Sequence, residues 1–495
     1  MAERIAQENL LDFTGITCDS RKVKPGYAFV AISGFKTDGN KFIDEAVRNG
    51  AKAIFTEKAP VKRQKYIDNI PLIQVKNARE YLAFLAAHHH DHPSKEINLI
   101  GITGTNGKTT TTHLIYHLLN YNVINNSRKK LAGLIGTINV DTGKNIFPGK
   151  LTTPDSITLQ EYLREMVDNG LKYACMEVSS HGIKLRRIGN TRFTVKVGTN
   201  ISADHFDLHP DLNDYIQVKK DFLKDNSNIP VLINQDNKYL GSFGQIAKNQ
   251  INYSINNKSD VYADKIEKWG RGQSFLYHLN KNLISENEQI TKPFVLKIMM
   301  NLPGEHNIYN ALIAVTIALY YNISMDLIQG FFENFRGIWR RLEFVYDKEF
   351  TIIDDCAHNP GSYEAVFTSI SRLNFNKVIV VNSLRGNRGT AINKKNADII
   401  AKYIRKFNKH LLITTNCNEV VKEIDRVSLE EEETFIHTLY NNNLVFEHYQ
   451  LLHPALQRAL DIVEKNDIIL LLGPHAMDRA AVMIMEMFKN IYMLE

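Results

Sequence analysis

The chain has 495 residues, of which 44% are hydrophobic and 23% charged, and its formal net charge is +6. This length exceeds one ordinary hydrophobic core and predicts two to four domains. Basic residues are scattered among acidic ones, which excludes the concentrated positive surface of a nucleic-acid-binding protein. The apolar run DIILLLG near the end is far shorter than a membrane span.

Two features bear on the cellular compartment. The N-terminal stretch MAERIAQENL lacks the apolar centre of a secretion signal. The cysteines lie far apart, without a CxxC pair, at Cys18, Cys175, Cys356 and Cys417. Such spacing indicates reduced thiols, so we expect a cytoplasmic protein.

Three segments of the chain differ in their pattern of apolar residues. Residues 1–93 hold short strand-like runs such as YAFVAI, and a helix is predicted over 82–92, ending at Pro93. Residues 94–335 repeat strand, glycine turn and helix, which is typical of a parallel sheet with crossover helices. Residues 336–495 contain the runs FTIIDD, KVIVVN, LLITTN and DIILLLG. The pattern predicts an α/β protein of three domains, the last with a Rossmann-like sheet.

A glycine-rich turn follows the apolar run INLI, since residues 101–115 read GITGTNGKTTTTHLI. Glycines between a strand and a helix let backbone N–H groups converge on phosphate oxygens. Lys108 would reach the outer phosphates and the Thr109 hydroxyl would ligate Mg²⁺, as in a P-loop ATPase. The spacing is not the standard one, because Ile102 stands where the first glycine belongs, and a turn that only joins strand to helix is the alternative. The predicted ATP-binding residues here are Gly104, Thr105, Asn106, Gly107, Lys108, Thr109 and Thr110.

The stretch GTNGKTT resembles the ATP loop of the Mur ligases, specifically the MurE branch, which joins an amino acid to a UDP-sugar peptide. Residues 19–39 resemble the MurE N-terminal domain. Further motifs resemble those of the family in the same order: LTTPDS (151–156), MEVSSHG (176–182), TNISADHFDLH (199–209), YIQVK (215–219), GEHNIYNALIA (304–314), RRLEF (340–344) and DDCAHNP (354–360). The resemblance covers nearly the whole chain. It implies that the γ-phosphoryl group of ATP passes to a carboxylate and that an amine then attacks the acyl phosphate.

The resemblance also implies two Mg²⁺ ions, held by Thr109, Glu177, His205 and a carbamylated Lys219. A neutral lysine amine that captures CO₂ becomes an anion able to ligate metal, whereas an ammonium would repel the ion. Taken alone, Glu177 is a strand-end carboxylate in a surface pair, and His205 is a histidine with satisfied partners. Lys219 alone is a solvated helix lysine. Its neighbour Lys220 is the rival, because the two point about 100° apart on a helix.

The second half of the nucleotide site is implied at Asn307, Asn310, Arg341 and Asp355. The asparagines fit contacts to adenine and the nearby loop, with helix capping as the alternative. The arginine resembles the one that crosses from the third domain to the phosphates, and the aspartate resembles the ribose-binding carboxylate. Arg340 and Asp354 are the rivals of this last pair.

The carboxylate-bearing substrate is expected at Ser20, Thr152, Thr153, Ser179 and Arg187, where MurE enzymes bind the UDP-sugar and its peptide. Taken alone, each of these residues is a cap or a surface hydroxyl. MurE enzymes carry a His-Gln-Ala stretch after the glycine that is Gly34 here. This chain has Phe35, Lys36 and Thr37 instead, which is a departure from the family pattern.

The amino-acid side departs further from the family. MurE enzymes for diaminopimelate carry Asp-Asn-Pro-Arg where this chain reads TTNCNEV (414–420), and a Gly-His-Glu whose acid is replaced by Ala476. An unpaired charged group in such a pocket is costly, so diaminopimelate is not the expected substrate. Arg388 resembles the arginine that grips the α-carboxylate. Catalytic roles are implied for Lys108, Lys219 and His358, the last with a capping or packing role beside Pro360 as its alternative.

The sequence therefore predicts an ATP-dependent amide ligase of the MurE type, acting with Mg²⁺ on a UDP-sugar peptide and an amino acid. No nucleic acid or membrane partner is expected, and the chain is expected to be a monomer. A ligase for a non-murein acceptor, such as a pseudomurein precursor, a glutamyl chain or a specialised-metabolite peptide, is the alternative enzyme. A non-catalytic ATP-binding protein is the alternative from another class.

Overall fold

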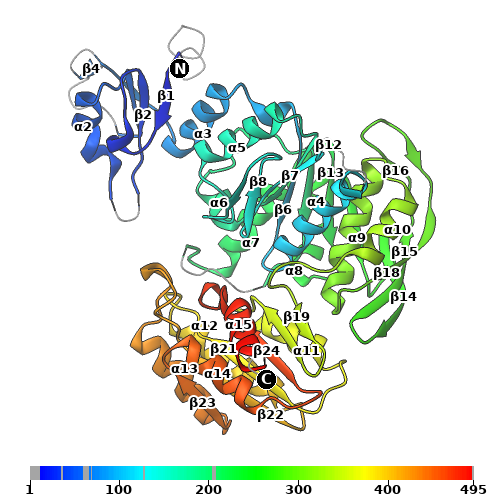
Figure 1. Cartoon of the computed structure of the whole chain (residues 1–495). Coiled ribbons are helices and arrows are strands. Elements are labelled where there is room, and N and C mark those ends of the chain that lie inside the picture. The colour runs from blue at the N-terminus through cyan, green and yellow to red at the C-terminus, as the bar shows by residue number, and fades with distance from the viewer. Residues whose placement is uncertain are drawn as a thin grey trace. The chain divides into compact units, whose positions relative to one another are not determined.

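The structure, a computed structural model, describes residues 12–34, 37–58, 66–67, 70–125, 129–202 and 208–492. The chain divides into two compact units, Met1–Ile201 with Leu208–Asn252, and Ser202–Asp207 with Tyr253–Glu495. Both units contain helices and strands (Figure 1), which confirms the predicted α/β class. Within the described part of the chain, no helix has both the length and the apolar character to cross a membrane.

The first unit begins with a sheet in the order β1-β2-β3-β5-β4. Its strands are β1 (Gly15–Thr17), β2 (Tyr27–Ala31), β3 (Ala53–Thr56), β4 (Tyr66–Ile67) and β5 (Ile70–Gln74), accompanied by η1 (Ser20–Lys22), η2 (Gly39–Phe42), α2 (Ile43–Arg48) and α3 (Ala78–His89). All of its pairs are parallel except β4–β5. The helix predicted over 82–92 is α3, which starts earlier because Asn77 caps its first turn.

The larger sheet of the first unit runs β12-β11-β6-β10-β7-β8-β9. Its strands are β6 (Asn98–Thr103), β7 (Ala132–Ile135), β8 (Asn139–Asp141), β9 (Ile146–Pro148), β10 (Tyr173–Glu177), β11 (Val195–Gly198) and β12 (Asp225–Asn234). The helices are η4 (Pro93–Lys95), α4 (Lys108–Asn125), α5 (Ser156–Asp168), α6 (Ser180–Lys184), α7 (Leu212–Leu223) and α8 (Lys238–Gly241). β6 pairs in parallel with β10 and β11. The loops that leave their carboxyl ends therefore meet at one edge, where open α/β sheets bind ligands.

Strand β13 (Ala247–Ser254) carries the chain from the first unit into the second. An antiparallel ribbon follows, made of β14 (Val261–Trp269), β15 (Gly272–Leu279) and β18 (Phe294–Met300), with a small pair β16 (Leu283–Ile284) and β17 (Ile290–Thr291). Helices α9 (Glu305–Tyr320) and α10 (Met325–Asn334) come next. The strand–turn–helix pattern predicted for 94–335 misses this ribbon. Buried and exposed residues alternate along β18, as in a half-buried strand, but its sequence FVLKIMM is apolar at every position except Lys297 and does not show that alternation.

The second unit ends in a sheet of order β19-β20-β24-β21-β22-β23, parallel except for β19–β20. Its strands are β19 (Glu343–Asp347), β20 (Thr351–Asp355), β21 (Val378–Ser383), β22 (His410–Thr415), β23 (Phe446–Tyr449) and β24 (Ile468–Leu472). Its helices are α11 (Pro360–Ile370), α12 (Thr390–Ile404), η5 (Glu423–Asp425), α13 (Leu429–Asn441), α14 (Leu452–Ile462), η6 (His475–Met477) and α15 (Ala480–Tyr492). The four predicted strands of this segment are β20, β21, β22 and β24, which confirms a Rossmann-like sheet.

Each face of this C-terminal sheet packs against its own apolar core. Ile353 and Leu470 belong to one core and Ile352 and Ile469 to the other, because successive residues of a strand point to opposite faces. The sheet is thus covered on both sides, as parallel sheets require. The domain boundaries proposed from the sequence, after residues 93 and 335, fall inside η4 and between α10 and β19, and they remain a prediction.

Candidate active site

The glycine-rich turn joins β6 to α4. Gly104 has a φ of +155° and Gly107 a φ of +83°, backbone conformations that favour glycine. A Cβ atom on Gly104 would lie 1.9 Å from Thr199 Oγ1. The turn leads into α4, whose N-terminus provides N–H groups and the positive end of the helix dipole for an anion.

A neighbouring loop holds this turn in shape. The N–H of Thr105 donates to Asn200 O at 2.8 Å, and the N–H of Asn106 donates to Asn200 Oδ1 at 2.9 Å. Thr199 Oγ1 in turn donates to Asn106 O at 2.7 Å. Thr199 and Asn200 received no role from the sequence, although they open the motif TNISADHFDLH. They contact the turn because they follow β11, which pairs with β6 in the sheet, and the sequence does not show that strand order.

Lys108 and Thr109 follow the turn on the first residues of α4. The Nζ atom of Lys108 donates to the carbonyl oxygens of Gly104 and Thr105, at 2.9 Å each, so the ammonium lies against the loop. The hydroxyl of Thr109 donates to Glu177 Oε2 at 2.8 Å. Thr110 is buried beside them.

Glu177 ends β10 and is only 1% exposed, so the surface-pair alternative is wrong. Its carboxylate also accepts hydrogen bonds from the N–H of Thr137 at 2.7 Å and from its hydroxyl at 3.2 Å. The fold therefore brings Thr109, on the helix that follows β6, together with Glu177 at the end of the adjacent parallel strand β10.

Lys219 lies on α7 and is 1% exposed, so it is not a solvated lysine. Its Nζ atom donates to Thr103 Oγ1 at 3.3 Å and Gly104 O at 3.1 Å, and lies 4.7 Å from the ring centre of Tyr215. The rival Lys220 is half-buried and lies over the ring of Phe243 instead. The predicted ligand His205 lies outside the described residues.

The chemistry of these side chains fits Mg²⁺, which prefers oxygen ligands and commonly uses one carboxylate together with substrate phosphates. Glu177 and Thr109 provide a carboxylate and a hydroxyl in direct contact. No cluster of three or more His, Cys, Asp or Glu side chains suited to a metal occurs in the part of the chain that the structure describes. Lys219 is buried beside the same turn, where its Nζ atom contacts Gly104 O.

The residues predicted for the carboxylate-bearing substrate divide into two groups. Thr153 Oγ1 donates to Glu177 O at 2.9 Å and accepts from the N–H of Ser179 at 2.9 Å. Arg187 donates to Thr153 O at 3.0 Å, and Thr152 accepts from the hydroxyl of Thr137 at 3.0 Å. These four thus gather around Glu177. Ser20 lies instead in η1, where it donates to Glu45 Oε2 at 2.6 Å.

In the second unit, Asn307 and Asn310 are buried on α9. Asn307 Nδ2 donates to Pro303 O at 2.8 Å, and Asn310 Nδ2 donates to Asn307 Oδ1 at 3.1 Å. Gly304, not an asparagine, is the N-cap of this helix. The two side chains thus form one fixed pair.

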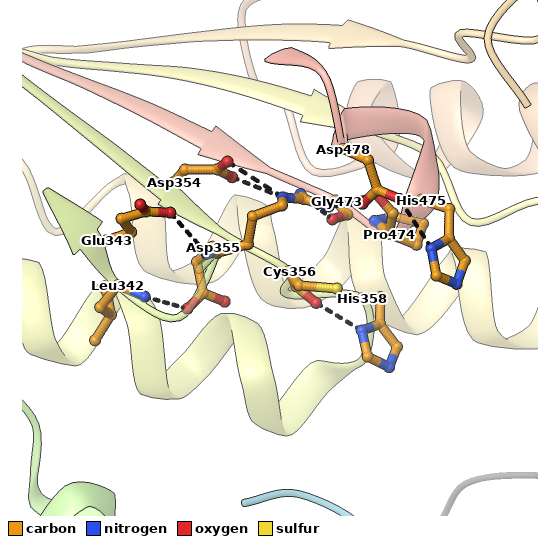
Figure 2. A network of polar contacts seen from close by, with 11 residues as sticks. Leu342, Glu343, Asp354, Asp355, Cys356, His358, Gly473, Pro474, His475 and Asp478 are labelled. Atoms are coloured by element: carbon orange, nitrogen blue, oxygen red, sulfur yellow. Dashed lines mark hydrogen bonds and ion pairs between the residues drawn. The ribbon is translucent and has the colours of Figure 1, made fainter. Parts of the chain in front are cut away.

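Asp355 ends β20 and accepts a hydrogen bond from the N–H of Leu342 at 2.8 Å (Figure 2). Burial raises the pKa of this carboxyl to about 6, against the opposing charge of Arg341. The rivals Arg340 and Asp354 pair with each other, since the guanidinium Nε donates to Asp354 Oδ1 at 3.0 Å. The four residues thus divide into a buried ion pair, Arg340 with Asp354, and an outer pair, Arg341 with Asp355.

His358 follows β20, immediately before α11. Its Nδ1 lies 2.6 Å from Cys356 O, which fixes the ring (Figure 2). Asn359, not His358, caps the helix, through a capping box with Ser362. The imidazole is partly exposed at the same edge of the sheet as Asp355.

Arg388 lies in the loop RGNRG between β21 and α12. Its guanidinium is 3.7 Å from Asp425 Oδ1. The N–H groups of Asn387, Arg388 and Gly389 donate to Glu431 at 3.0, 2.8 and 2.6 Å. Burial opposes the charge of Glu431, but these N–H groups and that of Ser428 outweigh it and lower its pKa.

A cavity of about 300 Å³ lies beside this loop and is lined by Asn387, Gly389, Thr390, Arg426, Ser428, Glu430 and Glu431. The sequence assigned no role to Arg426 or Glu431. The spacing of Ser428 and Glu431 is a usable signal, because it forms a capping box that starts α13. The segment TTNCNEV does not line this cavity. Its Asn416 Nδ2 donates instead to Glu432 Oε2 at 3.0 Å and to Gln450 Oε1 at 2.7 Å.

Known proteins resemble the chain over almost its full length. It is 31% identical over 475 residues to the UDP-N-acetylmuramoyl-L-alanyl-D-glutamate–2,6-diaminopimelate ligase of Oceanobacillus iheyensis, covering 93% of this chain and 89% of that protein. It is 32% identical over 476 residues to the enzyme of the same name from Clostridium botulinum, covering 94% and 91%. The chain belongs to the Mur ligase family. Residues 12–90 of this Mur ligase match the catalytic domain of the family, residues 102–318 its middle domain, and residues 340–475 its glutamate ligase domain.

Solved structures share the three-domain fold of this Mur ligase. A UDP-N-acetylmuramoyl-L-alanyl-D-glutamate–2,6-diaminopimelate ligase superposes with a TM-score of 0.62 at 21% identity, covering 93% of this chain and 89% of that one. MurF ligase from Thermotoga maritima in complex with ADP gives 0.60 at 16% identity, covering 98% of both chains. A pseudomurein peptide ligase type C from Methanothermus fervidus gives 0.56 at 19% identity, covering 96% and 99%. This Mur ligase is an ATP-dependent, ADP-forming amide ligase.

Proposed function

We propose that this Mur ligase joins an amino acid to a carboxylate of a UDP-sugar-peptide precursor in cell-wall peptide synthesis, as a cytoplasmic monomer. The acceptor class is taken from the relatives, whose names specify UDP-N-acetylmuramoyl-L-alanyl-D-glutamate. The observation that carries the proposal is the buried contact between Thr109 and Glu177, with Lys219 at the same edge of the sheet.

The first step transfers a phosphoryl group. A carboxylate oxygen of the acceptor attacks the γ-phosphorus of ATP, the bond from that phosphorus to the β-phosphate oxygen breaks, and ADP leaves. Lys108 and the N–H groups of residues 104–110 neutralise the oxygens on which charge collects. Thr109, Glu177, His205 and Lys219, carbamylated by addition of CO₂ to its neutral amine with loss of a proton, would hold two Mg²⁺ ions. The ions would supply fixed positive charge between the phosphate and the acceptor carboxylate.

The second step forms the amide. The free amine of the incoming amino acid attacks the acyl carbon, and phosphate leaves with the oxygen that came from the acceptor. Arg388 holds the α-carboxylate of the amino acid, and His358 orients the reacting groups. Thr152, Thr153, Ser179 and Arg187 hold the acceptor near Glu177, and Ser20 contacts its UDP-sugar end.

The remaining nucleotide contacts come from the second unit. Asn307 and Asn310 bind the adenine side, Asp355 accepts from the ribose hydroxyls, and Arg341 contacts the phosphates. The buried, paired state of the asparagines supports this assignment, because a prearranged pair loses little conformational freedom on binding.

The incoming amino acid is proposed to differ from diaminopimelate. Ala476 provides no acid for a distal ammonium, and Asn416 is turned toward α13. Arg426 and Glu430 line the cavity beside Arg388, which supports a side chain with a polar or charged end. A pseudomurein or other non-murein acceptor is the second candidate, favoured by the replacement of the family's His-Gln-Ala stretch by Phe35, Lys36 and Thr37.

The test is phosphate release from ATP with a panel of acceptors and amino acids, followed by mass analysis of the product. The proposal expects release that needs both a UDP-sugar peptide and an amino acid, and a product heavier than the acceptor by one amino-acid residue. Release only with acceptors that lack UDP would favour the second candidate. No release with any pair would favour a non-catalytic ATP-binding protein.

A further inference from the structure

Arg340 is a buried arginine with an unusual backbone. Its φ is +52°, a left-handed conformation that costs energy for any residue with a Cβ atom. Its side chain is only 2% exposed. A buried guanidinium is tolerated only when its donors are satisfied, so its partners should account for its position.

The guanidinium joins two parts of the second unit that are distant in sequence, the end of β20 and the loop that follows β24. Nε donates to Asp354 Oδ1 at 3.0 Å on β20. Nη2 donates to Gly473 O at 2.6 Å, and Nη1 donates to Pro474 O at 3.0 Å and to Asp478 Oδ1 at 2.5 Å. One side chain thus fixes the end of β20 and the whole loop that follows β24.

The end of β20 carries the groups assigned to the nucleotide. The N–H of Cys356 donates to Arg340 O at 3.0 Å, and Leu342 N–H donates to Asp355 at 2.8 Å. Arg341 lies between these two contacts in the sequence. Any shift of Arg340 would therefore move the outer pair Arg341 and Asp355.

The loop after β24 carries a histidine on the amino-acid side. His475 Nδ1 lies 3.1 Å from Asp478 Oδ2, and its side chain is 59% exposed. The hydrogen bond that His475 donates to the Asp478 carboxylate raises the pKa of His475; Asp425, the partner of Arg388, adds to this effect, and the charge of Arg340 opposes it. A continuous chain of contacts thus runs from exposed His475 through Asp478 and Arg340 to buried Asp354.

Resting on the proposed function, we propose that Arg340 is a positioning residue that couples the two substrate sides of the second unit. It holds Asp478 so that Asp478 fixes the imidazole of His475 toward the incoming amino acid. It also holds the strand end that presents Arg341 and Asp355 to ATP. His475 then takes the place that the missing acid at Ala476 leaves, as a cationic or hydrogen-bonding contact for a carboxylate or polar end of the amino acid.

The first test titrates His475 and needs no turnover. The pKa of His475 is measured by NMR of protein labelled with ¹³C-histidine. Because the chain has 17 histidines, the signal of His475 is identified by its absence in the His475→Gln variant. Arg340→Gly suits the left-handed backbone and removes only the side chain. If Arg340 holds Asp478 in place, both Arg340→Gly and Asp478→Asn lower the pKa of His475. A rise of that pKa in Arg340→Gly, which is the effect of losing a nearby positive charge alone, would overturn the proposal.

The second test compares KM values. Asp478→Asn is expected to raise the KM for the amino acid about tenfold while the KM for ATP stays within about twofold, and Arg340→Gly is expected to raise both. If Arg340→Gly does not fold, the double variant Arg340→Gly with Asp354→Asn replaces it, because it leaves no unpaired carboxylate in the core. The matched control is Asp467→Asn, since Asp467 is a buried carboxylate paired with Lys377 at 3.2 Å, just before β24 begins.

The outcomes separate the two proposals. Variants that only lose stability, as Asp467→Asn should, and that keep both KM values would overturn the coupling role. Absence of turnover in the wild type would overturn the ligase function. The pKa measurement of His475 would still show whether Arg340 positions Asp478 and His475.

Discussion

The phosphate-binding region of the first unit and the strand ends of the C-terminal sheet build their sites differently. In the first, short backbone contacts dominate, and the partners come from the ends of neighbouring strands β6, β10 and β11. In the second, charged side chains dominate, and Arg340 reaches Asp478 across 138 positions of sequence. The phosphate-binding region depends on backbone geometry, so it can serve ligases that act on many different acceptors. The second can change its selectivity through single side chains while the sheet stays the same.

The largest effect should come from the phosphate-binding region. Lys219→Ala is expected to reduce kcat/KM by about 1,000-fold, because it removes the residue proposed to hold metal between phosphate and carboxylate. Phosphate release measures it, and a short carboxylic acid should restore part of the rate. Lys220→Ala is the matched control, since its side chain lies over Phe243 and should keep full activity. Equal losses in both variants would remove the distinction between these lysines.

At the strand ends of the C-terminal sheet, buried Asp355 should make the free energy of unfolding depend on pH. Burial raises the pKa of Asp355 from 3.8 to about 6, so the folded state retains a proton that the unfolded chain releases between these values. The free energy of unfolding should therefore fall as pH rises from about 4 to about 6, by about 3 kcal/mol from this group. Denaturant unfolding of wild type and Asp355→Asn measures it, and the variant should lose this part of the slope. An unchanged slope would mean that Asp355 is ionised at low pH.

Removing the carboxylate beside Thr109 tests the metal assignment. Glu177→Gln keeps the shape and a hydrogen-bond acceptor but loses the charge, so kcat/KM should fall by about 100-fold. The Mg²⁺ concentration for half-maximal rate should rise, which a titration with MgCl₂ would measure. A lower rate with an unchanged Mg²⁺ requirement would assign Glu177 to positioning of Thr109 alone.

Substitution of Gly104 in the first region should affect the KM for ATP, and substitution of Gly386 in the second should affect the KM for the amino acid. Gly104→Ala places a Cβ atom 1.9 Å from Thr199 Oγ1 at a φ of +155°. The turn must shift, so the KM for ATP should rise by at least about tenfold. Initial-rate kinetics at saturating amino acid measures it. A KM for ATP equal to that of the wild type would show that the turn tolerates the methyl group.

The smallest effect is expected for Gly386→Ala, which places a Cβ atom 2.1 Å from Asp425 O. Displacing that segment should raise the KM for the amino acid severalfold, about three- to tenfold, because Asp425 pairs with Arg388. Initial rates at saturating ATP measure it, with Gly104→Ala as the reciprocal control. A larger effect on ATP than on the amino acid would contradict the division between the two regions.

Prediction from sequence follows the same division. The glycine turn, Lys108 and Thr109 are contiguous, so their spacing reveals the phosphate loop even without the standard pattern. The role of Thr199 and Asn200 depends on strand order, and the role of Arg340 depends on a partner far along the chain. Arg340 and Asp354 were only rivals of their neighbours, because sequence gives no measure of burial at adjacent strand positions. The antiparallel ribbon after β13 was missed because the strand–turn–helix pattern was extended across it.

The central claim, that the acceptor carboxylate is activated by phosphoryl transfer, is tested most directly by oxygen labelling. The acceptor is prepared with ¹⁸O in its carboxylate, and the phosphate, nucleotide and amide products are analysed by mass. The account predicts that one ¹⁸O per turnover appears in inorganic phosphate, together with ADP. Unlabelled phosphate, or ¹⁸O found in AMP, would contradict it.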